Sequence, residues 1–193
     1  YYYSGDYPAS LEFGLKALKL ARECGPVERE GWCLDLVAST YKDPEQALKI
    51  YKEAYEIFDR LECIEGQSRI LNNWSYTLME LNEYVPALEK ARKSHQLARE
   101  HGMHMDIINV AATIGEIFTR MGDFERAHEE LNEATLLFDQ YGRDISSVYI
   151  LVDLGQVYLE QNDLDRAEEQ LQKALEASNQ MEMVNEKVRC HQY

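Results

Sequence analysis

The residues of this chain that could do chemistry begin with a group of histidines near its middle. His101 and His104 stand three positions apart in the segment "HGMH", and His95 lies just upstream. Histidines can bind zinc when further ligands complete a tetrahedron, but no thiol or carboxylate at a ligand spacing completes a set here. We therefore predict a solvated joint between two helices and no metal site.

Paired carboxylates, such as Glu129–Glu130 and Glu168–Glu169, are the second candidate. They fall on the outward, polar face of predicted helices, where solvated charge is the simpler interpretation. The chain carries no G-x-S-x-G sequence, phosphate-binding loop, H-E-x-x-H sequence or dinucleotide-binding glycine pattern. We predict no enzyme activity and no cofactor within these residues, which leaves open a catalytic domain elsewhere in a parent protein.

The charge of the chain indicates which kinds of partner it can bind, and its cysteines indicate the compartment in which it works. The 193 residues include 35 acidic and 20 basic residues, for a formal net charge of -15. This balance disfavours nucleic acid and anionic membrane surfaces, and it favours a basic partner. The sequence shows no apolar run of membrane-spanning length and no signal peptide. Its four scattered cysteines are typical of a reducing compartment, so we predict a cytoplasmic protein.

One phrase occurs five times along the chain, which indicates architecture rather than a catalytic site. Successive acidic anchor residues are separated by 37, 40, 40 and 40 positions, and they are Asp6, Asp43, Glu83, Asp123 and Asp163. Four positions after each anchor a small residue follows: Ser10, Ala47, Ala87, Ala127 and Ala167. Two helices approach to about 8 Å only where neither carries a bulky side chain. This position therefore predicts the crossing point of a helical hairpin.

The positions before each anchor predict the first helix of the hairpin. Nine positions before the last four anchors stand Leu34, Trp74, Ile114 and Leu154, and eight positions before them stand Asp35, Ser75, Gly115 and Gly155. Large apolar residues thus flank a mostly small position. The turns "LNE", "MGD" and "QND" carry Gly or Asn, which tolerate the left-handed conformation that ends a helix. Longer polar joints, such as "REHGMHMD", are expected between hairpins.

The segments "LGQVYLEQNDLDRAEEQLQKAL" and "IGEIFTRMGDFERAHEELNEA" resemble the tetratricopeptide repeat. The resemblance implies an all-α, right-handed superhelical solenoid of about five hairpins plus a partial sixth, which binds peptides or proteins. The usual period is about 34 residues. The longer period here resembles that of bacterial regulatory proteins, such as Rap-type peptide sensors, sensor domains of diguanylate or adenylate cyclases and some transcription activators. The second repeat departs from the pattern at Asp35 and Pro44, so we expect it to pack less well.

We predict one solenoid domain over residues 1–193, cut from a longer protein. Its repeats are predicted at about 1–24, 25–64, 65–104, 105–143 and 144–182, with a partial repeat over 183–193.

The resemblance implies that the first helices line a concave face, and their polar stripe is the candidate binding site. The stripe comprises Arg29, Trp32, Arg69, Asn72, Asn73, Tyr76, Asn109, Thr113, Glu116, Tyr149, Asp153 and Gln156. Asn side chains donate and accept hydrogen bonds, which suits recognition of an extended peptide backbone, and Tyr and Arg are frequent interface anchors. The alternative is that these are merely solvated helix positions. Under the binding interpretation, Asn73→Ala should weaken partner binding and leave thermal stability nearly unchanged.

Three functions remain open from the sequence. The first is a binding module without catalysis, whose partner is a peptide of neutral or positive character. The second is the sensory or regulatory arm of a larger bacterial signalling protein. The third is a self-association segment that forms a homodimer through exposed solenoid ends.

Overall fold

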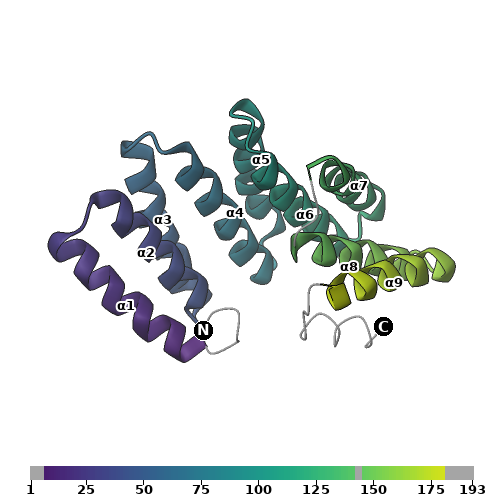
Figure 1. The fold of residues 1–193 in the computed structure, drawn as a ribbon, viewed down its shortest axis with the longest axis horizontal. Helices are drawn as coiled ribbons and strands as arrows, with labels where there is room; N and C mark the ends of the chain where they lie inside the picture. Colours follow the sequence, from purple (N-terminus) through teal and green to yellow (C-terminus); the bar gives the residue numbers. More distant parts are fainter. Residues whose placement is uncertain (1–6, 142–144, 181–193) are drawn as a thin grey trace. The chain divides into compact units, whose positions relative to one another are not determined.

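Helices joined by short turns make up the chain throughout the part that the structure describes (Figure 1). The computed structural model describes residues 7–141 and 145–180. The helices are α1 (Tyr7–Cys24), α2 (Val27–Thr40), α3 (Pro44–Arg60), α4 (Ile64–Glu80), α5 (Tyr84–Glu100), α6 (His104–Arg120), α7 (Phe124–Tyr141), α8 (Ile145–Glu160) and α9 (Leu164–Gln180). Within these ranges none of the helices is both long enough and apolar enough to cross a bilayer.

The helices pair into the predicted repeats, which confirms the all-α repeat fold. The hairpins are α2–α3, α4–α5, α6–α7 and α8–α9, and they correspond to predicted repeats 25–64, 65–104, 105–143 and 144–182, although α4 and α6 each begin one residue earlier than the predicted repeat. Helix α1 is the second helix of the first predicted repeat and packs against α2. The expected stub of a helix over residues 1–6 and the partial repeat over 183–193 lie outside the described residues.

The chain divides into two compact units, an N-terminal unit over Tyr1–Met103 and a C-terminal unit over His104–Tyr193. The division falls one residue before the predicted boundary between repeats 65–104 and 105–143. In the N-terminal unit one core cluster extends from Leu18 on α1 to Ile70 on α4. In the C-terminal unit Val148 and Ala174 belong to a cluster shared by α8 and α9. The single domain and its right-handed superhelical path stay predictions.

A residue with left-handed backbone recurs every 20 positions from residue 62 to residue 122 and again at residue 162, and it ends a helix each time. These residues are Glu62, Asn82, Gly102, Gly122 and Asn162, with φ between 52° and 77°. The amide of the next residue bonds a carbonyl five positions back, as Asp123 N does to Phe118 O at 2.9 Å. The left-handed residue itself bonds three positions back, which completes the Schellman motif. The expected role of Gly and Asn in the hairpin turns is confirmed.

The expected long joint at "REHGMHMD" is wrong. Helix α5 continues to Glu100 and α6 begins at His104, so the connection is as short as the turn inside a hairpin. The polar composition of this segment favours a loop in a sequence-based prediction. However, Arg99 and Glu100 are compatible with a helix, and α5 ends only before Gly102, whose φ of 65° is not helical. The period of 40 positions therefore comes from two helices of 17 residues and two short turns, as in α4 and α5.

Small residues lie where the helices of a hairpin cross, as predicted. In the C-terminal unit a Cβ added to Gly115 would stand 2.6 Å from Leu131 Cγ, and one added to Gly155 would stand 2.8 Å from Leu171 Cγ. Ala127 and Ala167, four positions after their anchors, are fully buried. Each crossing thus combines a small residue on the first helix with a large one on the second.

The second repeat turns differently from the others. Helix α2 ends at Thr40, and Asp43 caps α3 by accepting a hydrogen bond from the Glu45 amide at 3.0 Å. Pro44 occupies the first turn of α3, where its missing N–H leaves no hydrogen bond unmade. Pro44, which departs from the repeat pattern, therefore favours the start of α3 at this position.

Phe58 of α3 holds the N-terminal unit together by filling the space beside two glycines. An added Cβ would lie 2.7 Å from the Phe58 ring at Gly31 of α2 and 2.2 Å from it at Gly66 of α4. Phe58 is fully buried, so its ring has no free volume into which to move.

Gly66→Ala is expected to destabilise the N-terminal unit by about 1–3 kcal/mol through overpacking. A decrease in the free energy of unfolding would support the steric explanation, because Gly→Ala within a helix otherwise stabilises a protein by up to about 1 kcal/mol. Urea denaturation of the purified protein measures the change. The same substitution in a Phe58→Leu background should have a smaller effect, and an equal effect in both backgrounds would contradict the steric explanation.

Candidate functional site

The predicted polar stripe is divided between the two units. Its N-terminal part lies on α2 and α4 and comprises Arg29, Trp32, Arg69, Asn72, Asn73 and Tyr76. Its C-terminal part lies on α6 and α8 and comprises Asn109, Thr113, Glu116, Tyr149, Asp153 and Gln156.

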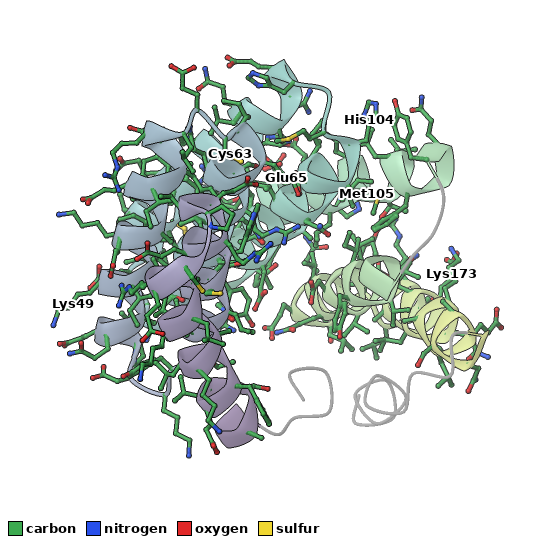
Figure 2. All side chains as sticks on the ribbon, turned by 60° about the vertical axis from the view of Figure 1, so that its left-hand side comes forward. Lys49, Cys63, Glu65, His104, Met105 and Lys173 are labelled. Carbon is green, nitrogen blue, oxygen red and sulfur yellow. The ribbon has the colours of Figure 1, made fainter. Side chains whose placement is uncertain are left out.

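Arg69 and Trp32 come together in the N-terminal unit. The Arg69 guanidinium carbon lies 4.9 Å from the centre of the Trp32 ring, a cation–π geometry. On its other side Arg69 approaches Glu65 of the same helix at 3.6 Å. Figure 2 shows Glu65 beside Cys63, at the start of α4. The Trp32 ring also packs on Phe58, with ring centres 4.5 Å apart, so the hairpin core positions this surface.

Asn73 makes a contact that the stripe alone did not predict. Its Nδ2 donates to Asp35 Oδ1 at 2.8 Å, which joins α4 to α2. Asp35 stands where the other repeats carry Ser75, Gly115 or Gly155, and from the sequence alone we expect it only to weaken packing. The signal in the sequence that could have identified Asp35 as a functional candidate is an acidic residue at a position where the other repeats have Ser or Gly.

Burial raises the pKa of Asp35 above its usual range. The hydrogen bond from Asn73 and the charge of Arg69 act in the opposite direction, and burial outweighs them. The ionised carboxylate therefore costs stability at neutral pH, although part of the side chain stays accessible to solvent. Asn73 supplies its hydrogen bond, so the expected neutrality of Asn73→Ala no longer follows.

Other members of the N-terminal part differ in their exposure. Asn72 has a buried Oδ1 that receives no hydrogen bond from the described residues. Arg29 is exposed, and Tyr76 is 46% exposed. A mixture of accessible and buried hydrogen-bonding groups therefore lies along α2 and α4.

In the C-terminal part, Glu116 and Thr113 interact with residues of their own helix. Glu116 pairs with Arg120 one turn later, at 2.9 Å. Thr113, which is only 8% exposed, donates to the carbonyl of Asn109 at 3.1 Å. Tyr149 is 38% exposed, and the remaining members, Asp153 and Gln156, are half-buried. Glu116 and Thr113 are therefore less available to a partner than the stripe suggested.

The histidines lie in structural contacts. The ring of His104 stacks on that of Tyr141, with centres 3.9 Å apart, and a ring nitrogen of His101 lies 3.0 Å from the Leu97 carbonyl. In the described part of the chain no three His, Cys, Asp or Glu residues are grouped as a metal would require.

Residues 106–180 match a family model described as the tetratricopeptide repeat. No curated protein matches the chain. This match and the fold confirm the predicted resemblance to tetratricopeptide repeats.

Among solved structures, a Rap protein complexed with Competence and Sporulation Factor is similar, with a TM-score of 0.90 and 15% identity over 97% of this chain and 53% of that one. The Rap conjugation gene regulator of plasmid pLS20, in complex with the Phr* peptide, has a TM-score of 0.87 and 14% identity over 98% and 53%. A putative kinesin light chain of Podosopora anserina has a TM-score of 0.65 and 12% identity over 93% and 90%. This chain spans about half the length of the two Rap proteins, and identities this low show a shared fold alone.

Asp35→Asn is expected to raise the melting temperature at pH 7. Because the folded-state pKa of Asp35 is raised, the folded protein binds more protons than the unfolded one between that pKa and the usual aspartate value of about 3.9. The loss of stability caused by ionised Asp35 is fully present at pH values above its folded-state pKa, and it disappears as the pH falls from that pKa to the usual aspartate value. The advantage of the variant over wild type, followed by circular dichroism, should therefore shrink as pH approaches about 4.

The matched control is Asp59→Asn, which removes the same charge from an exposed position on α3. A melting temperature for Asp35→Asn below wild type at pH 7, or a difference that does not change with pH, would contradict the assignment of a costly carboxylate.

Asn73→Ala is expected to lower the free energy of unfolding by about 1 kcal/mol or more, because Asp35 loses its hydrogen-bond donor. In an Asp35→Ala background the same substitution should have almost no effect, which makes a double-mutant cycle by urea denaturation the measurement. Asn179→Ala, at an exposed position on α9, is the control for a simple Asn→Ala change. Additive effects of Asp35→Ala and Asn73→Ala would show that the pair is not coupled.

Proposed function

We propose that this chain, a tetratricopeptide-like helical repeat protein, binds a peptide segment of a partner protein and has no catalytic activity of its own. The binding surface is the polar stripe on the first helices of the repeats. The observation that carries the proposal is the N-terminal part of the stripe, where Arg69 lies on Trp32 and Asn72 has a buried acceptor without a donor from the described residues. Packing alone favours apolar or paired side chains at such positions.

Two further facts support a peptide as the partner. Both Rap proteins that share the fold are in complex with a peptide or signalling factor by their own descriptions, Competence and Sporulation Factor in one and the Phr* peptide in the other. The net charge of -15 favours a basic or neutral peptide over an acidic one.

A regulatory arm of a larger bacterial signalling protein is the second candidate, favoured by the similarity to Rap proteins over about half of their length. In this role peptide binding would bias an output domain outside the chain, in the cytoplasm. Three free cysteines among the described residues fit a reducing compartment. The complete reading frame of the parent gene tests this candidate, because it either encodes such an output domain or does not.

Self-association is the third candidate. It is favoured by α1, where Leu20 is 59% exposed and Phe13 is 51% exposed. Apolar groups exposed together on one helix often mark an interface. A sedimentation coefficient that does not change with protein concentration would exclude a homodimer.

Peptide binding can be tested with heptapeptides selected from a random display library on the immobilised wild-type chain. The variant Arg29→Ala/Tyr76→Ala should weaken the selected peptides about tenfold or more, as expected for exposed interface anchors. The control Arg92→Ala/Tyr41→Ala changes the same residue types at exposed positions outside the stripe in the same unit. Affinity is measured by fluorescence anisotropy, and melting curves establish that both variants stay folded.

Equal binding of the selected peptides by both variants would place the binding surface elsewhere. A library that yields no specific peptide would contradict the proposed function itself.

A further inference from the structure

Asp35 has an unusual environment for a carboxylate in a helical repeat. It lies partly buried on α2, next to the hairpin core, at a position that other repeats keep small. An ionised carboxylate can accept about four hydrogen bonds. Among the described residues Asn73 alone donates to it, and that bond uses Oδ1. Most of the accepting capacity of Asp35 is therefore unused.

The nearby cation, Arg69, does not donate a hydrogen bond to Asp35. Arg69 lies close enough to influence the charge of Asp35, yet its guanidinium lies over the Trp32 ring and approaches Glu65 at 3.6 Å. On α4 the residue next to Asn73 is Asn72, whose buried Oδ1 also receives no donor from the described residues. Two acceptors, Asp35 Oδ2 and Asn72 Oδ1, thus receive no hydrogen bond from the described residues. A ligand that satisfies them must bring N–H groups, and a charged donor bonds a carboxylate more strongly than a neutral one.

We propose that Asp35 is the acceptor that binds a cationic group of the partner peptide, either a guanidinium or an ammonium group. Asn73 is a positioning residue that holds the carboxylate through Oδ1 and leaves Oδ2 for the peptide. This inference rests on the proposed function and adds the chemistry of one recognised group. The net charge of -15 attracts such a peptide over a longer range.

The proposal also explains why Asp35, which lowers the stability of the free protein, occupies a position that carries Ser or Gly in the other repeats. A partly buried carboxylate with a single protein donor destabilises the free protein, whereas Gly or Ser at the same position of the other repeats does not carry this cost. A bound cation would supply the missing hydrogen bonds and compensate the charge. Loss of stability in exchange for binding is a common property of functional sites.

The test uses four pools of fluorescein-labelled heptapeptides in which the flanking positions are mixtures of Gly, Ser, Ala and Leu. Three acetylated, amidated pools carry arginine, lysine or citrulline at the central position, and citrulline is the neutral counterpart of arginine. The fourth pool has a free amino terminus and citrulline at the centre, with the label on the carboxyl-terminal side. Anisotropy measures binding to the wild-type chain, Asp35→Asn and Asp59→Asn at two salt concentrations.

We expect the wild type and Asp59→Asn to bind at least one cationic pool about tenfold more tightly than the acetylated citrulline pool. Asp35→Asn should lose this preference. Preference for the arginine or lysine pool identifies a side chain as the ligand group, and preference for the free-amine pool identifies the peptide terminus. Melting curves of Asp35→Asn, which are expected to show a higher melting temperature than the wild type at pH 7, establish that loss of binding by this variant does not come from unfolding.

Two results would overturn the inference and leave peptide binding intact. In the first, the wild type binds cationic and citrulline pools equally. In the second, Asp35→Asn and Asp59→Asn lose the preference to the same extent, which indicates general electrostatic attraction. Absence of binding to all four pools, together with failure of the display library, would overturn the proposed function as well.

Discussion

The close approach of two helix backbones at one point of each repeat is the constraint on which the hairpins depend. Gly115 leaves room for Leu131 in the C-terminal unit, and Gly31 leaves room for Phe58 in the N-terminal unit. Because protein interiors are packed with few voids, the large side chain fills the space that the small one leaves. This pairing sets the crossing of the helices, and the other faces are then free to carry the acidic and polar residues that function requires.

Regular helix ends make this packing repeat along the chain. A left-handed residue stops a helix both inside a hairpin, as at Gly122, and between hairpins, as at Gly102. The Schellman hydrogen bonds that follow leave room for only a short connection before the next helix. The constant spacing of 40 positions between the last four anchors keeps the first-helix stripe in register from one repeat to the next within a unit.

The second repeat departs from both rules, and it supplies Asp35, the carboxylate next to the N-terminal part of the stripe. A cap formed by Asp43 replaces the left-handed turn, and Asp35 replaces the small residue at the crossing. The consequence is a carboxylate that bonds Asn73 and lies close to the charge of Arg69. Departures from a repeat pattern that cost stability are expected where a protein recognises something, since other positions can be optimised for packing alone.

The sequence by itself determined the helical hairpins and their small crossing positions, because both follow from the spacing of small and apolar residues along each helix, whereas the polar stripe as a binding surface stays a prediction. It did not show that "REHGMHMD" is mostly helix, since polar composition does not distinguish a loop from the exposed end of a helix. The pairing of Asp35 with Asn73 joins residues 38 positions apart on different helices. Only the tertiary structure decided that contact, because it depends on how α2 and α4 pack around Phe58, and no local pattern specifies that geometry.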